Sequence, residues 1–337
     1  MKKKVYIDYL NVLAAMSVVF LHTNGVFWEY SEDKYWFSAN IIESVFYFGV
    51  PVFFMITGAT LLDYRKRYDT KTFFRKRAWK VLIPYTFWSL VGLVYVNRGF
   101  SQISFGSIVE HLVNSNAIAI YWFFVPLFQV YLMIPLLSAV PDNQKKSIYT
   151  YIAVGGFIIN SVIPFLISVF QIQLYFPLHF VAATDYLLLV VIGYLISHYE
   201  IPKKYRYAIY LLGAAGLFMH IIGTYTLSRA AGQIVHVYKG YCNVPCVMYS
   251  TAVFLFFVQL NDKLVALKIN KLIQFLRNYT FALYLMQFYF ENALDLIFKL
   301  NIYSIVYRLC MPFVILACCV IAANIIRKLP FGKIILP

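Results

Sequence analysis

The sequence has few charged residues for its length. Charged side chains make up 13% of the 337 residues, and only 14 residues are acidic, whereas a soluble protein carries about 25% charged residues. No polar stretch is long enough to form a separate soluble domain, so residues 1–337 are expected to form a single domain. With 62% hydrophobic residues and a mean hydropathy of +0.71, the composition predicts an integral membrane protein.

Cysteine and the common cofactor-binding motifs are also scarce. The five cysteines lie in or beside apolar segments and lack the spacing of zinc ligands, so we expect small buried side chains and no metal site. The sequence contains no P-loop and no GxGxxG motif, which argues against these two kinds of nucleotide site. It shows no clear internal repeat, which disfavours a standard secondary transporter built from two related halves.

Long apolar runs, in contrast, are abundant. A transmembrane helix needs about 20 predominantly apolar residues, and the runs of about that length predict an all-α, polytopic transmembrane helical bundle of about ten spans. Three lysines precede the first run, but no small-residue cleavage site follows it, so a retained span is expected rather than a signal peptide. The expected spans are 5–25, 41–62, 78–96, 118–139, 147–164, 179–198, 207–228, 243–260, 276–295 and 303–325.

The positive charge of the chain is distributed unevenly. If the N-terminus is cytoplasmic, 23 of the 29 lysines and arginines fall on the cytoplasmic side of these spans, as the positive-inside rule requires. This rule accounts for the formal net charge of +15 without a nucleic-acid partner. Both termini are therefore expected to be cytoplasmic.

The first span carries a stripe of polar residues. At 100° per residue, Asn11 and His22 lie about 20° apart around the helix, and Asp8 lies about 40° from His22. Polar side chains in a membrane span usually face a cavity or a partner rather than lipid, and a histidine can exchange a proton near neutral pH. The stripe therefore predicts chemistry inside the bilayer. The alternative is that Asp8 and His22 lie at opposite membrane interfaces and only anchor the helix.

A basic segment leads into the third span. Residues 65–80 contain eight lysines and arginines; part of that charge is expected to serve only as the orientation signal. Arg75, Arg77 and Lys80 differ because they enter the helix, where Arg77 and Lys80 are three residues apart and share a face. Arginine binds phosphate in a bidentate way and lysine acts as a point charge. The segment therefore predicts a clamp for the phosphate of a cytosolic ligand or of a membrane lipid headgroup.

Other polar side chains occur near the expected outer ends of spans. Trp122 lies at the expected outer start of the fourth span, where it is either part of an aromatic belt or part of a site. Tyr131 lies inside that span, where its hydroxyl is less usual. Glu43 and Asp185 lie near the outer starts of the second and sixth spans. Either residue could contact a polar substrate or simply be solvated at the interface.

Four segments, taken in order, resemble acyltransferase family 3, a family of integral membrane acyltransferases. They are IDYLNVLAAMSVVFLH, which ends at His22, then PVFFMITG, FFRKRAWKVLIPY and YWFFVPLFQVYLMIPLL. In this comparison His22 takes the place of a catalytic histidine, and Arg77 and Lys80 take the paired basic positions. The segments TDYLLLVVIGYLI and RNYTFALYLMQ, which ends at Gln287, match more weakly. Within the family, the enterobacterial common antigen O-acetyltransferase type is the most similar.

The resemblance implies a multi-pass enzyme of a bacterial cell membrane. Such an enzyme moves an acyl group from cytoplasmic acyl-CoA, here acetyl-CoA, to a hydroxyl of an envelope glycan or lipid-linked sugar, with no permanently bound cofactor. His22 would act as general base or would be acylated transiently. The donor is expected on Asn11, Arg75, Arg77 and Lys80, and the acceptor on Trp122, Tyr131, Asp185, Gln287 and Glu43.

Two positions depart from the family pattern. Asn11 stands where the family commonly has the arginine of an R-x10-H motif, and Gln287 stands where the ninth span often ends in histidine. Lys4 or the basic segment would then hold the donor. The alternative reading is a transporter or flippase in which the polar stripe and the basic segment form a permeation path, because intramembrane ionisable residues suit transport as well. A third reading, a membrane module that binds amino acids, lacks the soluble catalytic domain usually fused to it.

Overall fold

The computed structural model describes residues 4–100, 103–174, 178–184 and 186–337, and within these ranges every regular element is a helix. Seven helical segments are long and apolar enough to cross a membrane, and two shorter apolar helices accompany them. The all-α, polytopic prediction is therefore confirmed. The seven segments are Tyr6–Thr23, Lys34–Lys66, Thr70–Val96, Ala119–Ser138, Asp142–Phe170, Lys203–Ala231 and Ile305–Ile326, and the shorter helices are Leu187–His198 and Val244–Gln259.

Most of these segments are composed of more than one helix. The predicted ninth span holds α16 (Thr280–Phe298), which carries two acidic residues in its second half. The helices of the segments are α1 (Tyr6–Thr23), α2 (Lys34–Phe46), α3 (Gly49–Leu61), α4 (Thr70–Arg77), α5 (Ile83–Val96), α7 (Phe124–Ser138), α8 (Asp142–Phe157), α9 (Ile163–Phe170), α10 (Leu187–His198), α11 (Lys203–Phe218), α12 (Thr224–Ala231), α13 (Val244–Gln259) and α17 (Ile305–Ile326). Four short helices connect or flank them: α6 (Phe105–Asn114), α14 (Asn261–Ala266), α15 (Asn270–Arg277) and α18 (Gly332–Ile335).

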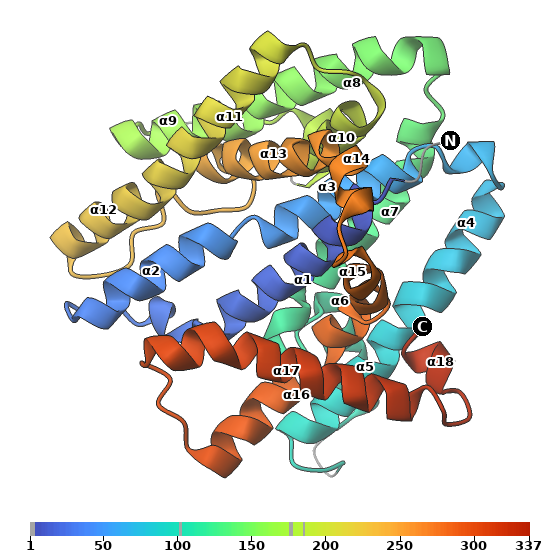
Figure 1. The fold of residues 1–337 in the computed structure, drawn as a ribbon, viewed down its shortest axis with the longest axis vertical. Helices are drawn as coiled ribbons and strands as arrows, with labels where there is room; N and C mark the ends of the chain where they lie inside the picture. Colours follow the sequence, from blue (N-terminus) through green and yellow to red (C-terminus); the bar gives the residue numbers. More distant parts are fainter. Residues whose placement is uncertain (1–3, 101–102, 175–177, 185) are drawn as a thin grey trace.

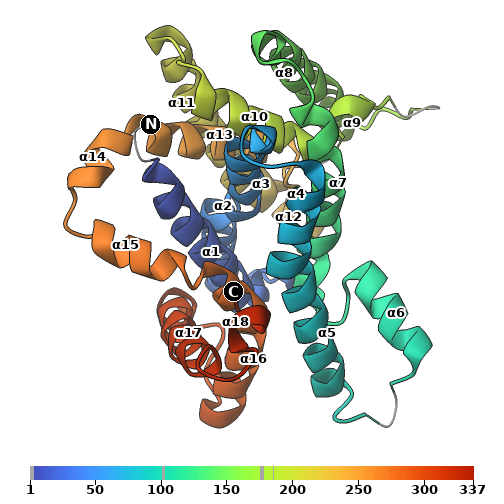
Figure 2. The ribbon, with the colours of Figure 1, turned by 90° about the vertical axis from the view of Figure 1, so that its right-hand side faces the viewer.

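Helix α1 occupies the centre of the bundle. It packs against α2, α3, α13, α15, α16 and α17, and 83% of its apolar window is buried inside the protein. Figure 2 shows α1 between α14–α17 on one side and α4, α5 and α7 on the other. A helix buried on all sides exposes no face to lipid, so the polar residues of α1 must face protein or a cavity.

The two ends of the described chain lie on the same side of the bundle as α4 (Figure 1). Helix α4 carries Arg75, Lys76 and Arg77 in its last turn. The positive-inside rule assigns this side to the cytoplasm, which agrees with the expected location of both termini.

Three long segments contain a single wide π-helical turn. The turns are Ala78–Leu82, Ile158–Val162 and Met219–Gly223. The first two are followed within two residues by Pro84 and Pro164. A proline in a helix has no N–H to donate and its ring clashes with the preceding turn, so a locally wider turn lets the helix continue past it.

Helices α3 and α10 approach each other at two glycines. A Cβ atom on Gly58 would lie 1.8 Å from the carbonyl oxygen of Val190, and one on Gly193 would lie 2.1 Å from that of Met55. The two backbones are therefore in direct contact. Small residues allow this close packing between membrane helices, where van der Waals contact is a main source of association energy.

Candidate active site

The polar stripe of α1 faces two cavities that adjoin each other. Asn11 lines a cavity of 190 Å³, and His22 lines a second cavity of 240 Å³ farther toward the outer side. The two share four wall residues, which are Val18, Val50, Phe123 and Tyr284. The cavities therefore follow one another along α1, and the face predicted to be polar is the face that lines them.

Asp8, the third residue of the stripe, has a different environment. It is buried, and its Oδ1 lies 3.0 Å from Nε of Arg277, at the end of α15. This ion pair fixes the cytoplasmic start of α1 against α15. Asp8 thus contributes to the position of α1 rather than to the cavity walls around Asn11 and His22.

His22 lies in the last turn of α1 with Gln287 beside its ring. Gln287, on α16, is buried, and its side chain interacts with the imidazole. In the described part of the chain, His22 Nδ1 and Gln287 Oε1 are both buried without a partner at hydrogen-bond distance. The structure therefore brings together two residues that sequence reasoning placed in different spans, and it leaves both with unused hydrogen-bonding capacity.

Aromatic side chains form one wall of the His22 cavity. Trp122 and Tyr241 both line it, with ring centres 5.6 Å apart and planes inclined by only 14°. Trp28 is a third aromatic lining residue. A cavity with flat aromatic walls and a few polar groups is typical of a site for a small ligand that has both polar and apolar faces.

Glu43 also lines the His22 cavity, but it is not solvated at the membrane interface. Only 1% of its surface is exposed, and its Oε1 lies 3.7 Å from Nζ of Lys239. Solvation at the interface, one of the two alternatives for this residue, is therefore wrong. The reason is that α2 begins at Lys34, seven residues before the expected start of the span at position 41, so Glu43 lies deep in the helix.

Lys239 is the polar residue near this site that sequence reasoning missed. It lies in the loop between α12 and α13, and no spacing in the sequence relates it to α2. The available signal was that Lys239 is one of the six lysines and arginines that fall outside the cytoplasmic side.

The inner cavity is adjacent to the basic segment through Tyr131. Tyr131 lines the Asn11 cavity, and the guanidinium carbon of Arg77 lies 5.7 Å from the centre of its ring. Within the described residues, Arg77 Nε is buried without a hydrogen-bond partner. Tyr131 is thus brought to Arg77 rather than to His22, on the side expected for the donor.

Arg77 and Lys80 do not share an inward face. Arg77 is partly buried, whereas Lys80 and Arg75 are exposed. Lys80 lies inside the π-helical turn Ala78–Leu82, where more residues per turn rotate it away from the position that α-helical spacing predicts. Only Arg77 of these three cations is directed toward the cavity.

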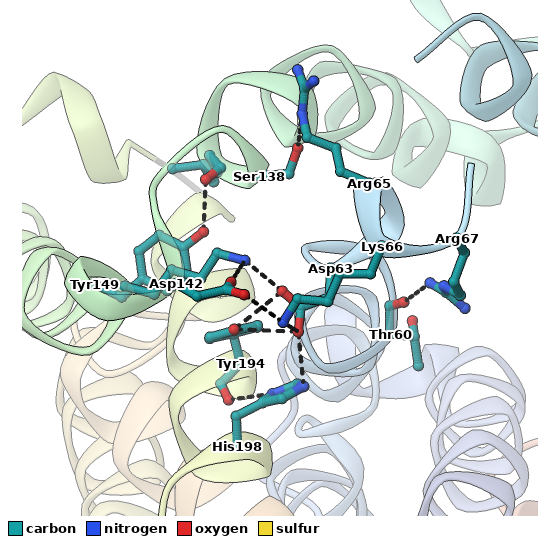
Figure 3. A network of polar contacts seen from close by, with 12 residues as sticks. Thr60, Asp63, Arg65, Lys66, Arg67, Ser138, Asp142, Tyr149, Tyr194 and His198 are labelled. Carbon is teal, nitrogen blue, oxygen red and sulfur yellow. Dashed lines mark hydrogen bonds and ion pairs between the residues drawn. The ribbon is translucent and has the colours of Figure 1, made fainter. Parts of the chain in front are cut away.

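Several other cations of the cytoplasmic side have partners within the protein. Lys66 and Lys145 both pair with Asp63 and Asp142, at distances from 2.5 to 3.4 Å. Figure 3 labels Asp63, Lys66 and Asp142 of this group. Tyr194 donates a hydrogen bond to Asp63 at 3.2 Å. This network, which we call the Asp63 cluster, connects the end of α3 to the start of α8 and the end of α10.

Further basic side chains are also engaged in local contacts. Arg65 donates to Ser138 Oγ at 2.9 Å and Arg67 donates to the Thr60 carbonyl at 2.6 Å, as Figure 3 shows. Lys4 lies 3.5 Å from the Ser197 carbonyl at the end of α10, although it was an alternative ligand for the donor. None of these contacts involves Arg75, Arg77 or Lys80, the three cations of the segment that are predicted to hold the donor.

Asp185 lies outside the described residues. In the part of the chain that is described, no group of three or more histidine, cysteine, aspartate or glutamate side chains could hold a metal ion.

Comparison with curated proteins and with solved structures found no match to this chain. A family model described as an acyltransferase domain, that of acyltransferase family 3, matches residues 4–324. This match covers every helix that lines the two cavities and favours an enzyme over the transporter alternative. The chain therefore belongs to acyltransferase family 3 and is a multi-pass membrane acyltransferase.

Proposed function

We propose that this acyltransferase is an O-acetyltransferase of the cell membrane. It takes the acetyl group from acetyl-CoA on the cytoplasmic side and transfers it to a hydroxyl of an envelope glycan or lipid-linked sugar on the outer side. The observation that supports this proposal most strongly is the pair of adjoining cavities along α1, one next to Arg77 and the other lined by His22. Together they offer a path for an acyl chain between the two sides.

The donor binds at the cytoplasmic end of this path. Arg77 contacts the wall of the inner cavity through Tyr131, while Arg75 and Lys80 are exposed nearby, so the three can bind the phosphates of CoA. Asn11 offers a polar contact farther in. His22 is eleven residues after Asn11 on α1, so the thioester has to extend about 16 Å along the helix from Asn11 to reach His22.

The acceptor binds in the outer cavity, where its sugar ring lies against Trp122 and Tyr241. His22 takes the proton from the acceptor hydroxyl as its oxygen bonds to the acetyl carbonyl carbon. The carbon–sulfur bond then breaks, and the departing CoA thiolate recovers the proton from the imidazolium. Gln287 orients the imidazole ring of His22 during all of these steps. A second route has the imidazole attack the thioester first and pass the acetyl group to the acceptor afterwards.

Acetyl transfer by the purified protein tests the proposal. Protein in lipid nanodiscs is given radiolabelled acetyl-CoA and a panel of glycans, and the His22→Ala variant is compared with the wild type. We expect transfer by the wild type and a loss of about 10²-fold or more in the variant, the scale of general acid–base catalysis. His111→Ala serves as control, because His111 lies on α6 and bonds locally to Asn116. Transfer that survives in His22→Ala would remove His22 from the mechanism.

A further inference from the structure

A buried pair of opposite charges adjoins the outer cavity, and the chemistry proposed for His22 makes no use of it. Glu43 and Lys239 come from α2 and from the loop before α13, and 2% of each side chain is exposed. Burying two charges is costly unless the protein holds them in a favourable geometry. A buried ion pair next to the proposed catalytic histidine indicates that the pair has a function in the site.

The Glu43 carboxylate is held on one side and open on the other. Oε1 lies 3.7 Å from the Lys239 ammonium, and the Asn24 side chain lies beside the carboxylate. Asn24 is itself fixed, because it donates to the Ala39 carbonyl at 2.9 Å and accepts from Arg308 at 3.2 Å. Oε2, in contrast, is buried with no hydrogen-bond partner among the described residues. A buried acceptor atom of this kind is usually satisfied by a ligand or a water molecule.

Lys239 is held in place by three aromatic rings that surround its ammonium group. Its ammonium nitrogen lies 4.2 Å from the ring centre of Phe27, 4.6 Å from that of Tyr47 and 5.7 Å from that of Trp28. Such contacts between a cation and aromatic faces are attractive. The carbonyl of Lys239 also accepts a hydrogen bond from Asn243 at 3.0 Å. Burial lowers the pKa of Lys239, and the Glu43 carboxylate opposes that change.

We propose that Lys239 is a positioning residue that turns Glu43 so that Oε2 accepts a hydrogen bond from the acceptor hydroxyl next to the reacting one. His22 and Glu43 line the same cavity, so one acceptor can present one hydroxyl to each. The acceptors that this site selects are then sugars with two adjacent hydroxyl groups. This inference rests on the proposed function and specifies its substrate class.

The first test compares acceptors that contain or lack the second hydroxyl. Acetyl transfer at saturating acetyl-CoA is measured with methyl glycopyranosides and with their monodeoxy analogues. For the wild type, we expect loss of the adjacent hydroxyl to raise the acceptor KM about tenfold to a hundredfold, the effect of one hydrogen bond to a charged group. In Glu43→Gln, the KM for the intact sugar should rise by a similar factor. Removing the adjacent hydroxyl from the sugar should then raise the KM of this variant little further.

The outcomes of this test separate the inference from the function. Equal wild-type KM values for the intact sugar and every deoxy analogue overturn the inference while leaving the transferase in place. A wild type that transfers acetyl to none of these sugars also overturns it. An absence of acetyl transfer to any acceptor in the wider glycan panel refutes the proposed function instead. Acetyl-CoA affinity should be the same in Glu43→Gln and the wild type, because the pair lies in the outer cavity.

A charge exchange separates positioning from mere stabilisation. Lys239→Met should raise the acceptor KM with little change in kcat, and Lys239→Arg should restore it. The double variant Glu43→Lys with Lys239→Glu recreates the ion pair but places a cation at the cavity wall. We expect its melting temperature to recover and its acceptor KM to stay high, and a recovered KM would show that the pair only stabilises the fold. Lys34→Met, at an exposed lysine of α2, should match the wild type.

Discussion

The Asp63 cluster allows a quantitative prediction about the cytoplasmic side of the protein. Lys145 has only 4% of its side chain exposed, and Asp63 has 20%, with 2.5 Å between Nζ and Oδ1. Asp63→Asn would remove the partly buried anion while leaving the buried cation. Removing one partner of a buried ion pair lowers the free energy of unfolding by about 3–5 kcal/mol.

The cost should be lower here because Lys145 keeps a second partner. Asp142 Oδ1 lies 2.8 Å from its ammonium, but Asp142 is 62% exposed, so solvent screens this contact. We therefore expect Asp63→Asn to destabilise the protein by about 2–4 kcal/mol. At roughly 2 °C per kcal/mol for a large chain, this corresponds to a decrease in melting temperature of about 4–8 °C.

Thermal unfolding of the purified protein in one detergent measures the change, with two further variants for comparison. Lys66→Ala should lower stability by less than about 1 kcal/mol, because 54% of the Lys66 side chain is exposed. Asp63→Leu with Lys145→Met should unfold at a higher temperature than Asp63→Asn, since it leaves no unpaired buried charge. The reasoning is refuted if Asp63→Asn melts with the wild type, or if the apolar double variant is the least stable of the three.

Three further changes test other parts of the structure. Arg77→Ala should weaken acetyl-CoA binding about tenfold or more, and the remaining binding should depend less on salt than that of the wild type. The control Lys71→Ala, at an exposed lysine, should weaken binding much less. Equal acetyl-CoA affinities of Arg77→Ala and the wild type in a titration would exclude Arg77 from the donor site. Gly58→Val should fail to reach wild-type stability, because its Cβ would lie 1.8 Å from a carbonyl oxygen, whereas Gly25→Ala has open space and should be tolerated; size-exclusion profiles and melting temperatures decide this. Gln287→Ala should lower kcat about tenfold with an unchanged KM for acetyl-CoA, and an unchanged kcat would show that Gln287 does not orient His22.

The sequence predicts well those features that depend on local pattern. Runs of apolar residues indicate the spans, the distribution of lysine and arginine indicates the orientation, and a period of 100° per residue places Asn11 and His22 on one face. Each of these depends on residues close together in the chain or on a simple count. For α1 the helical period is sufficient because the helix is regular from Tyr6 to Thr23.

The same reasoning fails where the helix changes or where distant segments meet. Lys80 leaves the face of Arg77 because a π-helical turn intervenes, and the signal for it, a proline at position 84, does not specify how the helix accommodates the ring. The contact of Glu43 with Lys239 joins residues that are far apart in the sequence, and only the packing of α2 against the loop before α13 brings them together. The hydrogen-bonding vacancy on Glu43 is equally a property of three-dimensional packing.

The backbone contact between α3 and α10 constrains which parts of the protein could move during the proposed acyl transfer. Helix α3 carries Val50, which lines both cavities, and its Gly58 lies against the backbone of α10 with no room for a methyl group. Two helices packed this closely cannot rock or slide past each other without losing the contact. One wall of the passage is therefore fixed, so this side cannot take part in alternating access. In the proposed transfer, any widening of the passage between the two cavities would therefore have to come from the walls other than α3.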